Sequence, residues 1–110
     1  MKFLAGETNV PLAATRVALS TDASINATDR VLWARFKGKP GNTGDVYVGD
    51  VTVAAAQGWT LVKTDSVGLE LPIRTLVGQG GRPGSIPADS IYFDAATNGD
   101  DVQWAVLLED

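Results

Sequence analysis

Hydrophobic and polar residues alternate along much of this chain, and the C-terminal run shows the alternation most clearly. Within residues 101–109, one face would carry Val102, Trp104, Val106 and Leu108. A period of two is typical of a β-strand that buries one of its faces. The opposite face would carry the mixed set Gln103, Ala105, Leu107 and Glu109. We therefore expect a strand that is central in a sheet or lies at a contact between subunits.

The same period recurs in shorter runs, at residues 16–20, 30–37, 46–49, 65–71 and 91–94. In the second of these, the cleaner apolar face consists of Leu32, Ala34 and Phe36. Trp33 lies on the other face, which becomes charged along the strand, so we expect this side chain at the rim of the domain or beneath a loop. Residues 51–57 fit a single helical turn, and a short irregular crossing fits them equally well.

Turn-forming residues separate these runs at short intervals, at positions 22–29, 38–44, 57–58, 78–87 and 97–100. Asn98-Gly99 is the strongest hairpin signal, because Asn and Gly adopt the positive φ angles that tight hairpin turns need. The pair predicts that strands near 89–95 and 101–109 form an antiparallel hairpin. About seven short strands with frequent turns predict an all-β fold, either an antiparallel β-sandwich or a small barrel. We favour a single antiparallel β-sandwich of jelly-roll-like form.

The first residues of the chain differ from the rest. Pro11 favours an extended conformation at Val10, and Lys2-Phe3-Leu4-Ala5 has the composition of a short edge strand. We expect residues 1–13 to form an extended N-terminal arm that leaves the sandwich and adds a strand to a neighbouring protein. The alternative is a frayed terminus with one edge strand. The β-sandwich domain is expected to span residues 14–110.

Composition narrows the chemistry that this chain can perform. Its 110 residues suggest one domain, and they include neither cysteine nor histidine. Disulfides, cysteine-based metal sites and catalytic triads with histidine are therefore excluded. The net charge is −4, with 9 basic and 13 acidic residues and no run of basic ones, which disfavours binding to nucleic acid. We expect a protein that packs or binds, and not an enzyme.

The sequence contains no stretch that resembles a targeting or membrane-spanning segment. The three apolar residues that follow Lys2 fall short of the roughly 7–15 that a signal peptide needs. The apolar run at residues 104–108 is far shorter than the ~20 residues that span a bilayer. We expect no membrane association and synthesis in a cytoplasm.

Two kinds of loop are candidates for binding sites. The glycine-rich loop at residues 78–84 lacks the Lys-Ser/Thr ending of a phosphate loop and precedes no predicted helix. It is better explained as a surface loop, from which Arg82 would project toward a partner. The oxygen-rich stretches 22–29 and 98–101 are favoured as turns over calcium or magnesium sites, because Asp and Asn bond their own backbone in turns. We expect no metal ion and no cofactor.

The aromatic residues divide into core and surface candidates. Trp104 and Phe93 lie on alternating apolar faces and are expected in the core. Trp59 follows Gly58 at a turn and is the best candidate for an exposed contact, although a core position is favoured even for this residue. A row of exposed aromatic side chains would favour a carbohydrate-binding module, with Trp59 or Trp33 in the binding surface.

Four segments of the sequence together resemble a family of small virion proteins. These segments are 42–50 (NTGDVYVGD), 58–61 (GWTL), 65–71 (DSVGLEL) and 89–102 (DSIYFDAATNGDDV). Between residues 14 and 108 the chain resembles the head decoration, or cement, proteins of tailed bacteriophages. The resemblance marks strands and turns of one sandwich and includes no catalytic signature. It implies a structural protein on the capsid exterior, commonly a homotrimer, which clamps neighbouring subunits of the major capsid protein.

The resemblance and the strand pattern together suggest where partners would bind. Ala105 and Leu107, on the second face of the last strand, are candidates for a face buried between subunits. The complete set of candidate interface residues is Phe3, Leu4, Val10, Leu12, Trp59, Arg82, Ala105 and Leu107. The expected partner is the major capsid protein lattice. The alternatives are a phage tail or fibre module and a carbohydrate-binding module.

Overall fold

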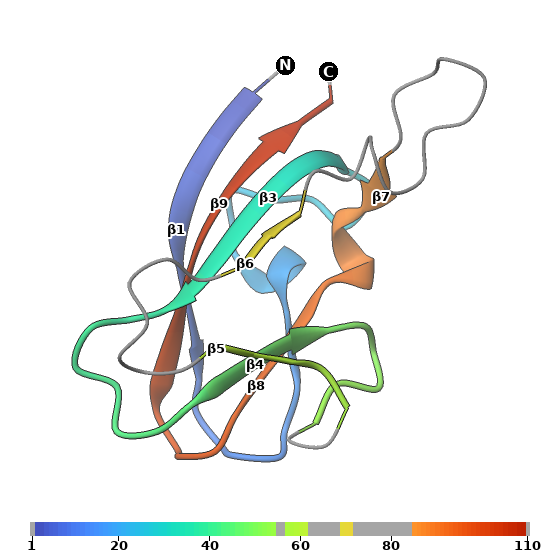
Figure 1. Cartoon of the computed structure of the whole chain (residues 1–110). Coiled ribbons are helices and arrows are strands. Elements are labelled where there is room, and N and C mark those ends of the chain that lie inside the picture. Colours follow the sequence, from blue (N-terminus) through green and yellow to red (C-terminus); the bar gives the residue numbers. More distant parts are fainter. Residues whose placement is uncertain (1, 55–56, 62–68, 72–84, 110) are drawn as a thin grey trace.

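A computed structural model describes residues 2–54, 57–61, 69–71 and 85–109, with the backbone alone at 69–71. Two antiparallel β-sheets pack against each other in these residues (Figure 1). The predicted all-β sandwich is therefore confirmed. No helix in the described ranges is long and apolar enough to cross a membrane. The run 65–71 is described only over its last three residues, and the glycine-rich loop at 78–84 lies outside the described residues.

The first sheet contains the two termini of the described chain. Its strand order is β1 (Lys2–Val10), β9 (Asp100–Leu108), β3 (Arg30–Gly38) and β6 (Leu69–Leu71), and β7 (Ile86–Pro87) also pairs with β3. The second sheet has the order β2 (Val17–Ala18), β8 (Tyr92–Ala95), β4 (Val46–Gly49) and β5 (Trp59–Leu61). Two single 3₁₀ turns, η1 (Leu19–Thr21) and η2 (Ala88–Ser90), follow β2 and β7.

Strand β9 lies between the two longest partners in the molecule. It pairs with β1 along its whole length and with β3 from Val31↔Leu108 to Gly38↔Val102. The predicted core face of this strand is confirmed, because its buried residues are Asp100, Val102, Trp104, Val106 and Leu108. β9 therefore occupies a central position in the sheet, which is one of the two positions that its pattern predicted.

The core lies between the sheets and is closed by side chains from both. Phe36 of β3 and Phe93 of β8 meet edge to face, with ring centroids 5.7 Å apart, which is a favourable geometry for aromatic pairs. Both side chains are fully buried. The other core residues include Val10, Leu19, Val31, Ala34, Val46, Leu61, Val102, Trp104 and Val106. Core positions for Trp104 and Phe93, as predicted, are confirmed.

The predicted core face of the segment 30–37 is partly wrong. Ala34 and Phe36 are buried as expected, but Leu32 is only half-buried and Val31 takes its place in the core. The pairing of β3 with β9 shifts register between Val31 and Trp33. Such an irregularity inserts an extra residue into one strand and reverses the alternation before it.

The predicted hairpin around Asn98-Gly99 is also wrong. Strand β8 belongs to the second sheet and β9 to the first, so the turn carries the chain from one sheet to the other. Gly99 has φ +85°, whereas Asn98 does not have a positive φ. The tight hairpin turn that this dipeptide favours needs positive φ at both central residues. The single left-handed residue therefore makes a sharp corner without pairing the two strands.

The expected N-terminal arm is wrong for residues 2–10, because these residues form β1 inside the sandwich. The strand pairs continuously from Lys2↔Leu108 to Val10↔Asp100. Val10 is fully buried and Thr8 is buried. The inner face of β1 is not uniformly apolar, which is why its pattern did not indicate a core strand.

Gly6 and Thr8 on that inner face fit the indole of Trp104. A Cβ at Gly6 would lie 2.9 Å from Cζ2 of Trp104, so only glycine lets the ring lie against β1. The indole Nε1–H donates a hydrogen bond of 2.9 Å to the Thr8 hydroxyl. A buried polar group without a partner is costly, and here the partner comes from the first strand of the chain.

We expect Thr8→Val to lower the free energy of unfolding by about 1–3 kcal/mol, because the buried indole N–H loses its acceptor. Urea unfolding measures the change. The control is Thr60→Val, which alters an exposed threonine in strand β5. If Thr8→Val is no more destabilising than Thr60→Val, the Trp104 hydrogen bond does not hold β1 in place.

Candidate functional site

The candidate site is the outer face of the first sheet, which points away from the second sheet. Strand pairing arranges its side chains in three rows across β1, β9 and β3: Phe3–Leu107–Trp33, Ala5–Ala105–Arg35 and Glu7–Gln103–Lys37. We call these nine residues the outer face. The rows change from aromatic to small to charged along the strands.

The first row forms an exposed apolar patch. The rings of Phe3 and Trp33 stack with centroids 6.3 Å apart and an interplanar angle of 29°. Both residues pair with Leu107 of the intervening strand, so the rings meet above it. Phe3 remains 62% exposed. We call Phe3, Trp33 and Leu107 the aromatic patch.

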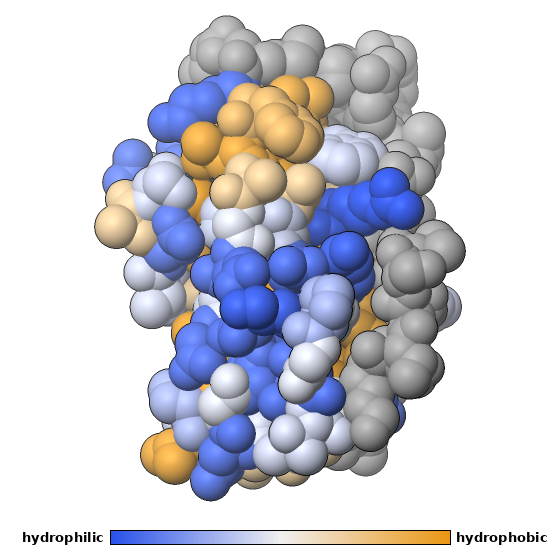
Figure 2. Space-filling model, turned by 90° about the vertical axis from the view of Figure 1, so that its left-hand side faces the viewer, coloured by the Kyte–Doolittle hydropathy of each residue, from blue (hydrophilic) through white to orange (hydrophobic). Residues whose placement is uncertain are grey.

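Figure 2 shows the molecule from the side on which β1 lies in Figure 1. Apolar side chains gather toward the end of the molecule that carries the termini, and hydrophilic side chains cover the surface below them. This division matches the change from the aromatic row to the charged row. The outer face is therefore amphipathic along the strand direction.

A surface hollow of about 560 Å³ lies over the second and third rows. Ala5 and Ala105 contribute small side chains to it, while Arg35 and Lys37 line it from β3 and Glu7 lines it from β1. Opposite charges thus stand on the two sides of the hollow. The arrangement suits a protein surface or another extended partner that presents both charges.

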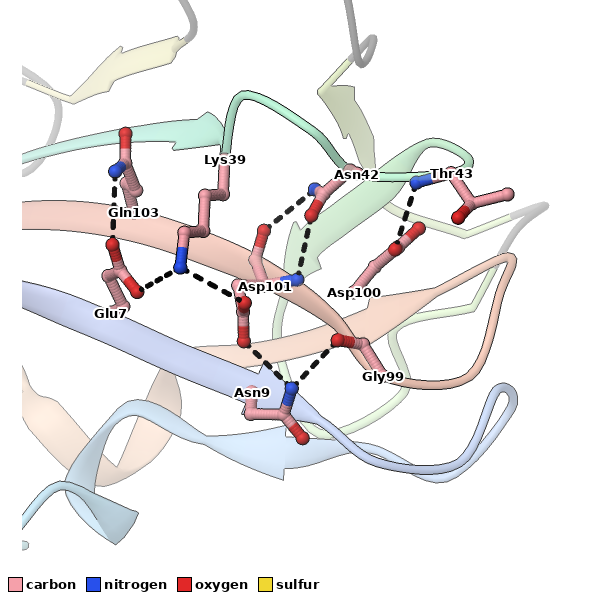
Figure 3. Close-up of polar contacts among 9 residues, drawn as sticks. All are labelled: Glu7, Asn9, Lys39, Asn42, Thr43, Gly99, Asp100, Asp101 and Gln103. Carbon is pink, nitrogen blue, oxygen red and sulfur yellow. Dashed lines mark hydrogen bonds and ion pairs between the residues drawn. The ribbon is translucent and has the colours of Figure 1, made fainter.

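Below the hollow, polar side chains tie β1 to the other strands (Figure 3). The Lys39 ammonium lies 3.0 Å from a Glu7 carboxylate oxygen and 3.7 Å from one of Asp101. Gln103 donates a hydrogen bond of 3.2 Å to the other Glu7 oxygen. Asn9 donates to the Asp101 carboxylate and to the Gly99 carbonyl, each at 2.8 Å.

The β3–β4 connection is fastened at the same end of the sheet. The Asn42 side chain exchanges hydrogen bonds with the backbone N–H and carbonyl of Asp101, at 3.0 and 2.8 Å. The buried Asp100 carboxylate accepts the backbone N–H groups of Thr43 and Gly44, at 3.0 and 2.8 Å. These contacts appear together in Figure 3, except for the Gly44 bond. The charged end of the outer face is thus rigidly supported.

Glu7 and Lys39 hold their charges at neutral pH. The pKa of Glu7 is lowered by hydrogen bonds from Lys39 and then Gln103. The pKa of Lys39 is raised, chiefly by its hydrogen bond to Glu7. A general acid or base works best with a pKa near the working pH, and both shifts move away from neutrality. The network is therefore suited to fastening strands and not to proton transfer.

The acidic stretch 22–29 has the turn hydrogen bonds that the sequence analysis favoured. One Asp22 carboxylate oxygen accepts the backbone N–H and the hydroxyl of Ser24, at 2.9 and 2.6 Å. Asp29 accepts the backbone N–H of Asn26 at 2.9 Å. Within the described ranges, no three acidic side chains are grouped so that they would hold a metal ion.

The sequence-predicted interface residues do not form one surface. Phe3, Ala105 and Leu107 lie together on the outer face. Leu4 is half-buried and packs against the core, and Val10 is inside it, so Val10 is wrong as an interface residue. These two point inward because even-numbered residues of β1 face the second sheet.

The remaining candidates lie elsewhere. Leu12, in the β1–β2 connection, is 56% exposed, and Trp59, on the edge strand β5, is 60% exposed. Arg82 lies outside the described residues. The sequence did not indicate Glu7 or Lys37 as interface residues, and it indicated Trp33 only for a carbohydrate-binding surface. Only the strand register places these residues beside Phe3 and Leu107.

Comparisons with known proteins do not indicate the function of this chain. No family model, no curated protein and no solved structure matches the chain. The outer face combines an exposed aromatic patch, a hollow and fixed charges on a sheet. We therefore treat it as the candidate site.

We expect the network around Lys39 to make stability depend on pH. A carboxyl with a lowered pKa in the folded state stabilises the fold above its unfolded pKa, and this contribution is lost as pH falls through the folded pKa. Glu7→Gln should therefore reduce stability at neutral pH and flatten the loss of stability on acidification. Urea unfolding at neutral pH and at about pH 3 measures this.

Glu109→Gln is the control, because the exposed Glu109 side chain has no hydrogen bond or ion pair with the described part of the chain. If both substitutions changed the loss of stability between neutral pH and about pH 3 equally, the role of Glu7 would be contradicted. The raised pKa of Lys39 adds a contribution that is present below its unfolded pKa and is lost only as pH rises through the folded value.

Proposed function

We propose that this protein is a non-enzymatic structural protein of a bacteriophage virion, which binds the outside of an assembled capsid and stabilises contacts between major capsid subunits. The observation that carries the binding role is the aromatic patch on the outer face. The virion context comes from the resemblance of segments 42–50, 58–61, 65–71 and 89–102 to head decoration proteins.

The aromatic patch supports binding to a protein surface. Contiguous exposed apolar residues on a soluble domain mark interaction sites, and aromatic side chains dominate the binding energy of many interfaces. Phe3 and Trp33 are already stacked in the free chain. Ordering them on binding therefore costs little conformational entropy.

The rigid strands beneath the patch support a clamping role. Strand β1 is held by continuous pairing with β9 and by the Glu7–Lys39 ion pair. A domain that binds an assembled lattice and not its free subunits stabilises the assembly by mass action. A preformed binding face suits this task, because it can match an arrangement of subunits that exists only in the assembled lattice.

The carboxylates in the described residues support a role without catalysis. Glu7 and Asp101 share the ammonium of Lys39, and Asp100 accepts two backbone N–H groups. The chain contains no histidine or cysteine to serve as base or nucleophile. Binding is therefore the activity that the geometry supports best.

We expect the purified protein to bind undecorated capsids of the same source saturably, at a fixed ratio to capsid subunits. Co-sedimentation measures the occupancy, and heating of bare and decorated capsids measures the stabilisation. Phe3→Ser should reduce the affinity at least about tenfold, as loss of a central aromatic contact does. Val51→Ser, which removes an apolar side chain of 57% exposure outside the outer face, is the control. Absence of binding by the wild-type protein would refute the virion role.

A carbohydrate-binding module is the second candidate, and the exposed Trp59 favours it. An exposed indole offers the flat apolar surface on which sugar rings stack. If this candidate holds, glycans should quench tryptophan fluorescence in the wild-type protein, and Trp59→Ala should lose the response while Trp33→Phe keeps it. A flat titration across a glycan array excludes this candidate.

A further inference from the structure

We propose that, in the protein free of capsid, the outer face is occupied by the same face of a second copy of this chain, in a two-fold dimer whose axis runs along β9. The inference rests on the proposed function only in taking the outer face as a protein-binding surface. It adds a second partner, which competes with the capsid for this face, and the orientation in which that partner binds. Three properties of the face support it, and they concern charge, shape and Lys37, which is unpaired within the described part of the chain.

The charges of the outer face are arranged so that two copies complement each other. Glu7 on β1 and Lys37 on β3 occupy the same row, on either side of Gln103. When a second copy is turned over about an axis parallel to β9, its β3 lies opposite β1 of the first. Glu7 of each copy then faces Lys37 of the other, which gives two intermolecular ion pairs.

The other two rows are complementary under the same rotation. In the aromatic row, Phe3 of one copy meets Trp33 of the other, and Leu107 lies on the axis opposite its own copy. In the middle row, the small Ala5 faces the long side chain of Arg35, so the alkyl part of Arg35 covers the floor of the hollow. A self-complementary patch of this kind is what a two-fold interface requires.

The alternative two-fold axis, perpendicular to the strands, fits the face poorly. That rotation would place the aromatic row of one copy on the charged row of the other. Glu7 would then face Phe3, and Lys37 would face Trp33. A carboxylate pressed against an apolar ring loses hydration without gaining a new partner. The charge pattern therefore selects the axis along β9.

Lys37 is a cation of the outer face that lacks a partner among the residues that the structure describes. It is half-buried and has neither a hydrogen bond nor an ion pair with any residue that the structure describes. Glu7 already binds Lys39 and Gln103, and each carboxylate oxygen can accept a further hydrogen bond. The intermolecular pair would thus satisfy Lys37 without breaking the network of Figure 3.

Sedimentation equilibrium of the full chain over a range of concentrations tests the dimer. The wild-type protein should pass from monomer to dimer as concentration rises. Lys37→Glu and Glu7→Lys each place like charges opposite one another twice per dimer, so each should weaken self-association at least about tenfold. Circular dichroism and urea unfolding verify that both variants are folded.

The decisive measurement mixes the two variants. A dimer of one Lys37→Glu chain and one Glu7→Lys chain again contains two ion pairs. One is the wild-type pair, and in the other the two charges are exchanged. The mixture should therefore associate as a 1:1 heterodimer about as tightly as the wild-type protein, although each variant alone self-associates at least about tenfold more weakly. Phe3→Ser should also abolish the dimer, while Val51→Ser should leave it intact.

Three results would overturn the inference. They are a wild-type protein that stays monomeric at all concentrations, a trimeric mass, and failure of the mixed variants to associate when the wild type dimerises. The proposed function has a separate readout, since a monomeric protein that still binds capsids saturably refutes only the dimer. A protein that dimerises, yet binds no capsid at concentrations at which it is monomeric, refutes only the virion role.

Discussion

The rest of this structure depends on the position of strand β9 between β1 and β3. Because β9 is paired on both edges, one of its faces must join the core and the other must form the middle of the outer face. Trp104 and Val106 point inward and close the core, whereas Ala105 and Leu107 point outward and underlie the candidate site. Stability and the proposed binding therefore depend on the same strand, and a change in its register would exchange the two sets of side chains.

The first strand is held to β9 by contacts on both of its faces. On the inner face, Trp104 lies against Gly6 and donates to Thr8. On the outer face, Glu7 is bound by Lys39 and Gln103. The segment that carries the exposed Phe3 is thus ordered before any partner arrives, which lowers the entropy cost of binding. Among the described residues, Lys37 stays unpaired across the hollow from Glu7, and these charges give the face its polarity.

Much of the fold was accessible to pattern reasoning, and the failures have identifiable causes. The alternation in 101–109 predicted the buried face of β9 correctly, because a strand covered on one side by a core shows its periodicity directly. The hairpin at Asn98-Gly99 was wrong, since the dipeptide specifies a sharp turn but not which sheet receives the next strand. The prediction of an N-terminal arm was wrong because Gly6 and Thr8 complement the indole of Trp104. Nothing local in the sequence of β1 indicates that contact.

The sequence by itself determined the class of the fold, the core face of its last strand and the absence of the side chains that common catalysis needs. These follow from residue type and local spacing, which a chain carries before it folds. Only the tertiary structure decided that Phe3 and Trp33 stack over Leu107 and that Glu7 stands across a hollow from Lys37. Such neighbours are set by the register between strands distant in sequence, and that register is fixed by packing across the whole sandwich.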